Sequence, residues 1–464
     1  MSRSILSNSN SPDAALARHI STTLSVPLPE EVEEKARMHL LDTLAAILSG
    51  RFLPAGEFGY RFANLHAGQG QASLLGCKQK VGAELAAFAN AMAAHADETD
   101  DSHVKGRFHP GCGVIPAALA MAEVQGRTGA ELLSAIVLGY DIGARATLSL
   151  GFSNPRTTTF STHAFGALFG ASSAAGALAG VSPPEAESLL SFTVQQASGL
   201  SYWNRDPDHV EKSFDFGARA ARNGVFAAQL AKAGMTSPDH PLTGVNSYLA
   251  AYAETARPEA LTQDLGTDHA ILDATIKKWS VGSPLQSMLD AVIAVFEGQP
   301  TPVEQIADIE LRLPSNRVHV IDDRHMPAVC AQHLAALAAL RGSVSFANSH
   351  NVELMQDTQI LALRKKIRLV PDDTLVGARP ERQSIVTVRF TNGDHRMHHA
   401  KVVRGTPDDP MSVDEVAAKA ADILGPIQTD KGERLISLCL KETFTPAALA
   451  AASRIDEGRM RKMA

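Results

Sequence analysis

Cysteine is scarce in this chain of 464 residues, and its positions show no pattern. Four cysteines without any CxxC spacing exclude the usual zinc motifs and a disulfide framework, which favours a reducing compartment. The chain also lacks a long apolar run, and its Ser/Asn-rich residues 1–12 lack the apolar core of a signal peptide. We therefore expect a cytoplasmic protein that does not bind membranes.

An excess of positive charge is missing as well. The net charge is -7 and the pI is about 6.2, so the composition does not favour binding to nucleic acid or to an anionic membrane. No glycine-rich dinucleotide fingerprint, Walker loop or GxSxG motif is present. These absences exclude several large enzyme classes. The remaining interpretation is a protein that binds a small molecule. If that molecule is anionic, a few local cations would have to bind it.

Aromatic residues are few, at 5%, whereas alanine is abundant, and this composition is typical of closely packed helices. From about residue 12 to residue 278, apolar residues recur with helical spacing in segments separated by Gly, Pro and Asn. Glu30–Leu48, Gly129–Leu148 and His163–Ala179 are examples of such segments. We predict that this region forms an all-helical domain.

The pattern changes after residue 300. Ile306–Leu313 and Ser384–Phe390 alternate apolar and polar residues with the two-residue period of half-buried strands. Asn392-Gly393 is a typical hairpin turn, so His395–Val403 is predicted to return as the next strand. Helical segments at 327–340 and 357–366 lie between these strands, which indicates a compact α+β domain.

Helical periodicity returns near the C-terminus, at 413–424 and 432–440. These segments are too short to form a core of their own, so we expect them to pack on the first domain. The predicted fold class is therefore mainly α. Residues 1–280 and 406–464 would form a large all-helical domain, and residues 281–405 a smaller α+β domain.

Charged and histidine residues gather between two alanine-rich segments. His95 to His109 contains three histidines and four acids within fifteen residues. Crowded carboxylates and imidazoles shift one another's pKa values, which suits proton abstraction next to a carboxylate or carbonyl. If the region is helical, Asp97 and Asp101 share a face, and Asp100 can meet His103. A polar loop and a divalent-metal site remain the alternatives.

His109 directly precedes Pro110, which marks a helix start. The positive end of the helix dipole lowers the pKa of an imidazole placed there, so that it can act as a base. Ser161-Thr162-His163 opens a glycine-containing helix, where hydroxyl and amide groups can form an anion pocket. Ser and Thr are also ordinary helix caps, and the glycines at 166 and 170 favour close helix packing.

Two further motifs carry cations. The segment from Trp203 to Phe214 offers Arg205 as a fork for a carboxylate and Lys212 as a compact charge for a developing enolate. A solvated helix start is the alternative. Lys277 lies where the helical pattern gives way to the α+β pattern, and ligand sites often lie at such domain boundaries, although paired lysines are commonly just exposed.

Taken in order, these motifs resemble the MmgE/PrpD superfamily, which includes 2-methylcitrate dehydratase, cis-aconitate decarboxylase and iminodisuccinate epimerase. The resemblance covers nearly the whole chain, and its order of spaced motifs is specific for the family rather than for one reaction. It rests on the Asp-rich 95–101 segment, His109-Pro110-Gly111, Gly139-Tyr140-Asp141, Lys212 with Gly217, the 220–224 segment, Lys277-x-Trp279-Ser280, Arg324 to Pro327, and Asp409-Pro410-Met411.

The resemblance implies a helical domain built from both ends of the chain, a smaller α+β lid, a homodimer and an active site in the cleft between domains. It implies neither a metal nor an organic cofactor. Carried over by motif, the catalytic positions are Asp97, His109, Lys212 and Lys277. Two positions depart from the family: Phe160-Ser161-Thr162 replaces a His-Pro-Thr, with His163 as a displaced imidazole, and Gly282 replaces a histidine.

We therefore expect a cofactor-independent lyase that removes water from a hydroxy di- or tricarboxylate of the 2-methylcitrate type. His109 or Asp97 would take the proton, Lys212 and Lys277 would hold the negative charge, and His163 would protonate the leaving hydroxyl. The residues predicted to bind substrate are Asp101, His103, Ser161, Thr162 and Arg205. An epimerase of the iminodisuccinate type, a cis-aconitate-type decarboxylase and a non-catalytic carboxylate-binding dimer are the alternatives.

Overall fold

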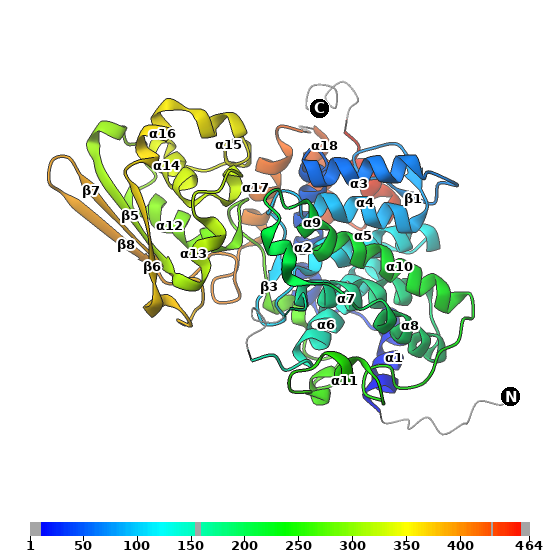
Figure 1. The fold of residues 1–464 in the computed structure, drawn as a ribbon. Helices are drawn as coiled ribbons and strands as arrows, with labels where there is room; N and C mark the ends of the chain where they lie inside the picture. Colours follow the sequence, from blue (N-terminus) through cyan, green and yellow to red (C-terminus); the bar gives the residue numbers. More distant parts are fainter. Residues whose placement is uncertain (1–10, 154–158, 428–429, 456–464) are drawn as a thin grey trace. The chain divides into compact units, whose positions relative to one another are not determined.

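The structure is a computed structural model that describes residues 11–153, 159–427 and 430–455 (Figure 1). The chain divides into two compact units by its internal contacts. The first comprises Met1–Ala96, Asp100–Ala274 and Ile427–Ala464, and the second comprises Asp97–Thr99 and Thr275–Pro426. The first unit is helical and the second combines helices with a small sheet, so the predicted mainly α fold class is confirmed.

The first unit is built almost wholly of helices. Its longer helices are α1 (Pro12–Thr22), α2 (Glu30–Gly50), α3 (Pro54–Leu65), α4 (Ala83–Ala94), α5 (Pro110–Gln125), α6 (Gly129–Leu148), α7 (Thr162–Ala179), α8 (Pro183–Gln195), α10 (Arg219–Lys232) and α18 (Asp430–Lys441). Its shorter elements are β1 (Ala72–Ser73), β2 (Lys80–Val81), β3 (Ser102–His103), η2 (Ser201–Arg205), α9 (Val210–Ser213), η3 (Phe214–Ala218), α11 (Tyr248–Tyr252) and α19 (Pro446–Ala452).

Helix α7 is the centre of the first unit and packs against α5, α6, α8 and α10 (Figure 1). Every residue of α7 except His163 is buried. Small side chains explain this burial, because they let neighbouring helices approach one another closely. A Cβ atom at Gly170 would lie 2.5 Å from the carbonyl oxygen of Gly139, and one at Gly143 would lie 2.5 Å from that of Gly166. The close helix packing expected at residues 166 and 170 is thus confirmed.

The second unit contains a four-stranded sheet in the order β6-β5-β7-β8. Strand β5 pairs parallel with β6 and antiparallel with β7, and β7 pairs antiparallel with β8. The strands and helices of this unit are α12 (Gln286–Val295), β5 (Ile306–Pro314), α13 (Ser315–Ile321), α14 (Ala331–Arg341), α15 (Phe346–Ser349), α16 (Thr358–Arg364), β6 (Ile367–Asp372), β7 (Ser384–Phe390), β8 (His395–Ala400) and α17 (Val413–Leu424). Strand β4 (Ala274–Thr275) spans the boundary between the units.

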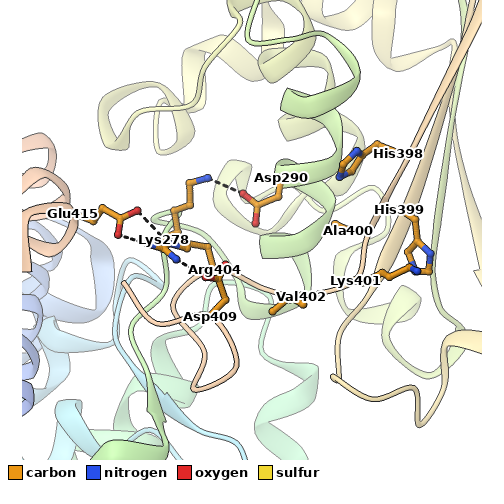
Figure 2. A pocket seen from close by; sticks show the side chains of 10 residues that line it. All are labelled: Lys278, Asp290, His398, His399, Ala400, Lys401, Val402, Arg404, Asp409 and Glu415. Carbon is orange, nitrogen blue, oxygen red and sulfur yellow. Dashed lines mark hydrogen bonds and ion pairs between the residues drawn. The ribbon is translucent and has the colours of Figure 1, made fainter. Parts of the chain in front are cut away.

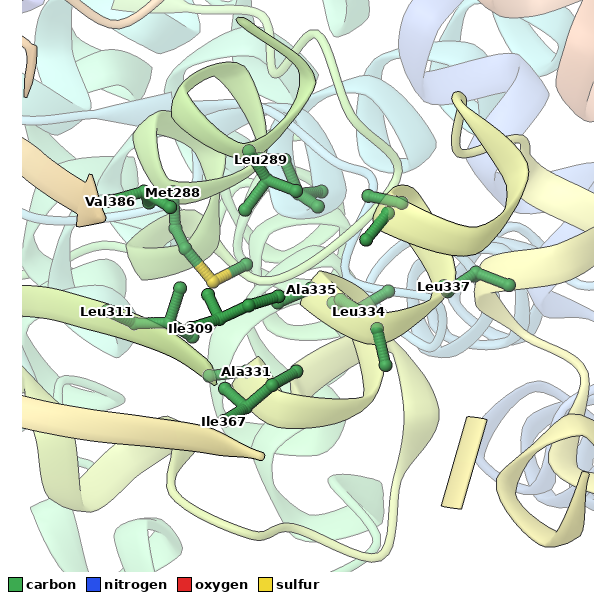
Figure 3. Packing of buried hydrophobic residues seen from close by; sticks show 14 of the residues in the cluster. Met288, Leu289, Ile309, Leu311, Ala331, Leu334, Ala335, Leu337, Ile367 and Val386 are labelled. Carbon is green, nitrogen blue, oxygen red and sulfur yellow. The ribbon is translucent and has the colours of Figure 1, made fainter. Parts of the chain in front are cut away.

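The core of the second unit lies between the sheet and helices α12 and α14 (Figure 3). Met288 and Leu289 of α12 and Leu334 of α14 meet Ile309 of β5 and Val386 of β7. All five side chains are fully buried. Each such side chain contributes about 1.5–3 kcal/mol through removal of apolar surface from water.

Three features of the second unit differ from expectation. Strand β6 was not predicted, because only its end residues Ile367 and Asp372 are buried and Pro371 interrupts the pattern of a strand. The strand after the Asn392-Gly393 turn ends at Ala400 rather than at residue 403. Residues 406–426, including α17, group with the second unit, whereas α18 and α19 group with the first.

Cys77, Cys112, Cys330 and Cys439 are all free thiols, as their spacing predicted. Across residues 11–153, 159–427 and 430–455, no helix has both the length and the hydrophobicity that crossing a membrane requires.

Candidate active site

A buried carboxylate lies between two histidines in the first unit. Helix α4 ends at Ala94, His95 is its C-cap, and His109 is the N-cap of α5, so two helix ends bring these histidines together. Asp100 Oδ2 lies 2.8 Å from His95 Nδ1 and 3.1 Å from His109 Nδ1. The side chains of His95 and Asp100 are fully buried, whereas that of His109 is 11% exposed. His109 is therefore the member of this group that a substrate can reach.

The hydrogen bonds of Asp100 determine what its histidines can do. An ionised carboxylate only accepts hydrogen bonds, so each Nδ1 must carry its proton and donate it to Asp100. The Nε2 atom of each imidazole then carries the lone pair, which is the form of a general base. A carboxylate behind the imidazole also stabilises the imidazolium that forms once a proton has been taken.

Sequence reasoning missed Asp100 as the partner of these histidines. It assumed that residues 97–101 continue a helix, in which Asp97 and Asp101 share a face. The helix instead ends at Ala94 and the chain turns. The four-residue spacing of Asp97 and Asp101 therefore does not place their side chains on one helix face. Asp97 Oδ1 accepts hydrogen bonds from the backbone N–H and the hydroxyl of Thr99, and it belongs to the second unit.

Asp101 lies behind the start of α5. Its carboxylate accepts the hydroxyl of Tyr140 at 2.5 Å, Nδ1 of His39 at 2.7 Å and the backbone N–H of Gly111 at 2.8 Å. Asp101, Tyr140 and His39 are all fully buried. These contacts favour a positioning role, in which Asp101 holds the first turn of the helix that His109 begins, over the substrate contact expected from the sequence. His39 was not identified beforehand, because a single histidine in an apolar helix carries no distinctive signal.

His103 is also an internal residue. Its Nδ1 accepts the backbone N–H of Gly106 at 2.8 Å and closes a tight turn. Burial lowers the pKa of His103 to about 4, so the ring is neutral near pH 7. This neutral, 2% exposed ring favours a structural role over the predicted substrate contact.

His163 lies near the Asp100 group, at the start of α7. Its ring centroid is 5.5 Å from that of His109 and 3.9 Å from that of Phe216, on which it stacks with an interplanar angle of 7°. Burial, followed by the nearby charges of His109 and Lys212, holds the pKa of His163 well below its usual range. The ring is therefore neutral near pH 7, and the proton-donating role that we expected for it stays a prediction.

The two hydroxyl residues before His163 bind other parts of the protein. Ser161 is the N-cap of α7, and its hydroxyl donates to Asp215 Oδ2 at 2.5 Å. Thr162 donates its hydroxyl to the carbonyl oxygen of Arg107 at 2.9 Å. Both residues are buried, so these hydrogen bonds favour the capping alternative over direct binding of substrate.

The two predicted cations of the 203–214 segment have different surroundings. Lys212 is partly buried, and its Nζ lies 5.4 Å from the centroid of the Phe216 ring. Arg205 is exposed, and its guanidinium lies 5.9 Å from the centroid of Tyr202. Since Phe216 also lies 5.3 Å from His109, ring centroid to ring centroid, Lys212 shares an aromatic neighbour with the candidate base.

Lys277 belongs to the second unit, where it is 1% exposed. Its Nζ lies 2.5 Å from the carbonyl oxygen of Glu98. The carbonyl groups on either side are held in the same way: His350 Nε2 lies 2.8 Å from the Asp97 oxygen, and Lys419 Nζ lies 2.9 Å from the Thr99 oxygen. Three side chains distant in sequence thus hold three consecutive carbonyl groups, a contribution to structure that the motif did not predict.

A cavity of about 430 Å³ lies elsewhere in the second unit (Figure 2). Lys278 forms an ion pair with Asp290 at 2.9 Å, and Arg404 pairs with both Asp409 and Glu415. Figure 2 shows these cations directed at their acidic partners. Because the three acids compensate the charge of these cations, this cavity does not offer the concentrated positive charge that a dicarboxylate needs.

The Asp100 group could also hold a metal ion. His95, Asp100 and His109 offer ligand atoms that all lie within 4.8 Å of one another. Two imidazoles and one carboxylate are a known ligand set for divalent transition metals. The same atoms are also at hydrogen-bonding distances, so the geometry fits either hydrogen bonds or a bound ion. Activity measured after treatment with a chelator can distinguish these two arrangements.

Comparison with known proteins relates both parts of the chain to one family. Residues 14–261 match the MmgE/PrpD N-terminal domain, and residues 279–442 match the MmgE/PrpD C-terminal domain. The cis-aconitate decarboxylase-like protein oryM of Aspergillus oryzae is 29% identical over 233 residues, which are 48% of this chain and 47% of the relative. The chain thus matches about half the length of this relative.

Proposed function

The chain belongs to the MmgE/PrpD family, and from this premise we propose that it is a cofactor-independent lyase that dehydrates a hydroxy di- or tricarboxylate of the 2-methylcitrate type. The observation that carries the proposal is the buried Asp100 carboxylate shared by His95 and His109. This arrangement provides a base whose tautomer is set, next to the start of a helix.

The reaction begins with removal of a proton from the carbon beside a carboxylate. His109 Nε2 takes this proton, while its Nδ1–H stays bonded to Asp100 and the carboxylate stabilises the imidazolium. The electrons of the broken C–H bond form the double bond as the hydroxyl leaves the neighbouring carbon. His109 then returns the proton to the departing hydroxyl, so that water is released and the base is restored.

The charge that develops on the substrate needs a cation. Lys212 supplies an ammonium group in the first unit, next to the aromatic ring that it shares with His109. An aimed cation of this kind lowers the barrier because it stabilises the enediolate-like charge more than the ground state. Asp97 and Lys277 stay proposed catalytic residues, Arg205 stays a proposed substrate contact, and a homodimer stays the proposed assembly.

The curated relative favours decarboxylation of an unsaturated tricarboxylate as a second candidate, since its name places it with cis-aconitate decarboxylases. Decarboxylation needs a group that protonates the carbon left by CO₂, and His109 could serve in its protonated form. Epimerisation remains a further possibility within the same chemistry, because it shares the first proton abstraction and omits the loss of hydroxyl.

The test is proton NMR of the protein in D₂O, after treatment with EDTA, with a panel of citrate-like, malate-like and imino- or aminosuccinate acids. New vinyl signals with retention of every carboxylate support dehydration. Release of CO₂ from an unsaturated acid moves the assignment to decarboxylation, and deuterium entering beside a carboxylate without an alkene moves it to epimerisation. Tight binding without any turnover would reject all three and indicate a binding protein.

A further inference from the structure

A π-helical turn, η3 (Phe214–Ala218), separates α9 from α10. A π-helical turn holds an extra residue relative to an α-helix and therefore changes which side chains point inward. Such turns are rare, and they frequently occur at functional sites. Here four residues, Asp215 to Ala218, are buried, whereas Phe214 is 37% exposed. The turn thus presents a defined set of side chains to the interior of the first unit.

Phe216 is the ring around which the histidines gather. His163 stacks on it in parallel at 3.9 Å, and the centroids of His95 and His109 lie 4.7 Å and 5.3 Å away. Trp203 closes the group, edge-on to Phe216 at 4.6 Å and 86°. Phe216 is 1% exposed, so its ring is enclosed by these neighbours and cannot turn aside without displacing them.

The residues on either side of Phe216 hold the turn in place. A Cβ atom at Gly217 would lie 2.9 Å from the carbonyl oxygen of Cys112 and 3.2 Å from that of Ala91, so only glycine lets the turn approach α5 and α4 this closely. Asp215 accepts the hydroxyl of Ser161, the N-cap of α7. The turn is therefore fixed to the helices that carry His95, His109 and His163.

We propose that Phe216, presented by this π-helical turn, is the positioning residue that fixes the ring planes of His163 and His109. The inference rests on the proposed function, since it assigns to Phe216 the positioning of the base in that reaction. An imidazole stacked on a fixed ring loses rotation about its side-chain bonds, and a misplacement of about 1 Å at a reacting group costs on the order of 100-fold in rate. Phe216 itself does not touch the substrate.

The same contact explains the electrostatic state of His163. Enclosure beside Phe216 keeps water from the imidazole, and the resulting loss of solvation lowers the pKa of His163. Lys212 adds to this effect and lies over the same ring, with Nζ 5.4 Å from its centroid.

The experiment compares F216L with F214L. Both variants shorten a phenylalanine of the same turn to the same residue, but Phe214 is partly exposed and contacts Phe88 instead of the histidines. Two quantities are measured: kcat and KM with the acid identified above, and the chemical shift of the His163 ring protons by NMR. We expect F216L to lose about 10- to 100-fold in kcat with little change in KM.

In the F216L protein the ring protons of His163 should also move downfield relative to those of F214L, because they lose the shielding of the stacked ring. The proposal is overturned if kcat and the His163 signals of F216L match those of F214L. It is overturned equally if only one of the two quantities changes. Should F216L fail to fold, F216M takes its place, because it keeps an apolar side chain of similar length without a ring.

If wild-type protein turns over none of the acids, the proposed function fails. The NMR comparison then still decides whether Phe216 fixes the ring planes of the histidines.

Discussion

Replacement of Asp100 by asparagine should impair the proposed base while it leaves the fold largely intact. Asparagine has the shape of aspartate, but its side-chain NH₂ group donates hydrogen bonds. Both histidines contact the same oxygen of Asp100, Oδ2. An amide oxygen at that position would keep both tautomers but lose the negative charge, whereas an amide NH₂ there would make each Nδ1 accept and move its proton to Nε2. An imidazole in that tautomer cannot take a proton from the substrate. The variant therefore tests the carboxylate charge and the tautomer together.

The magnitude follows from the role of the base. General acid–base assistance supplies about 10²–10⁴-fold, so D100N should lose at least about 100-fold in kcat, equivalent to about 3–5 kcal/mol of barrier. Stability should change less, by about 1–3 kcal/mol, because the buried asparagine can still form hydrogen bonds. Initial rates of alkene formation measure the first quantity, and denaturant unfolding measures the second.

Asp101 provides a matched control, since it is adjacent in sequence and equally buried. D101N keeps one oxygen, which can accept the hydrogen bond of either Tyr140 or Gly111, because these two groups donate to different oxygens of Asp101. It leaves the hydrogen bonds of His95 and His109 to Asp100 in place. We expect it to lose stability of the same order but less than about tenfold in kcat. A D100N protein within tenfold of wild type, or a D101N protein with the larger loss in kcat, would refute our account of the base.

Three further predictions concern the base, the metal and the pH dependence. H109A should lose at least about 100-fold in kcat while circular dichroism and the unfolding midpoint stay close to wild type; near-full activity in a folded variant would remove His109 from the mechanism. Activity should survive dialysis against EDTA, whereas loss on chelation and recovery with a divalent transition metal would show that His95, Asp100 and His109 bind an ion. The folded-state pKa of His103 is depressed to about 4. As the pH falls, the unfolded chain therefore protonates this histidine before the folded protein does. The contribution of His103 to stability is full above about pH 6.5 and is lost as the pH falls toward 4. The full loss from this residue is about 3 kcal/mol, and H103N should lose correspondingly less stability than wild type between pH 7 and pH 4.5 in denaturant titrations; equal losses would contradict the assignment.

The periodicity of the sequence was sufficient to predict most of the elements. Apolar spacing of 3.6 residues indicated the helices of the first unit, and the alternation of Ile306–Leu313 and Ser384–Phe390 indicated strands β5 and β7. The Asn392-Gly393 turn predicted the hairpin, which the register of β7 and β8 confirms. These signals are local, because a helix or a hairpin depends mainly on residues within a few positions of one another.

The candidate site was predicted less completely. His109 follows from its place before a helix-starting proline, and its role as candidate base stays a prediction. The choice between Asp97 and Asp100 could not be made from spacing, because it depends on where α4 ends and how the chain then turns. The contacts that enclose Asp101 likewise come from His39 of α2 and Tyr140 of α6, which lie far away in the sequence.

The sequence by itself determined the type of most elements and the family, since residue types, spaced motifs and local periodicity carry that information. Only the tertiary structure decided which carboxylate holds His95 and His109, and that Phe216 lies at the centre of the histidines. The physical reason is that hydrogen bonds and ring stacking depend on distances of a few ångströms between helix ends. Such distances are set by the packing of whole helices and by one extra residue in a π-helical turn, and neither leaves a periodic signal in the sequence.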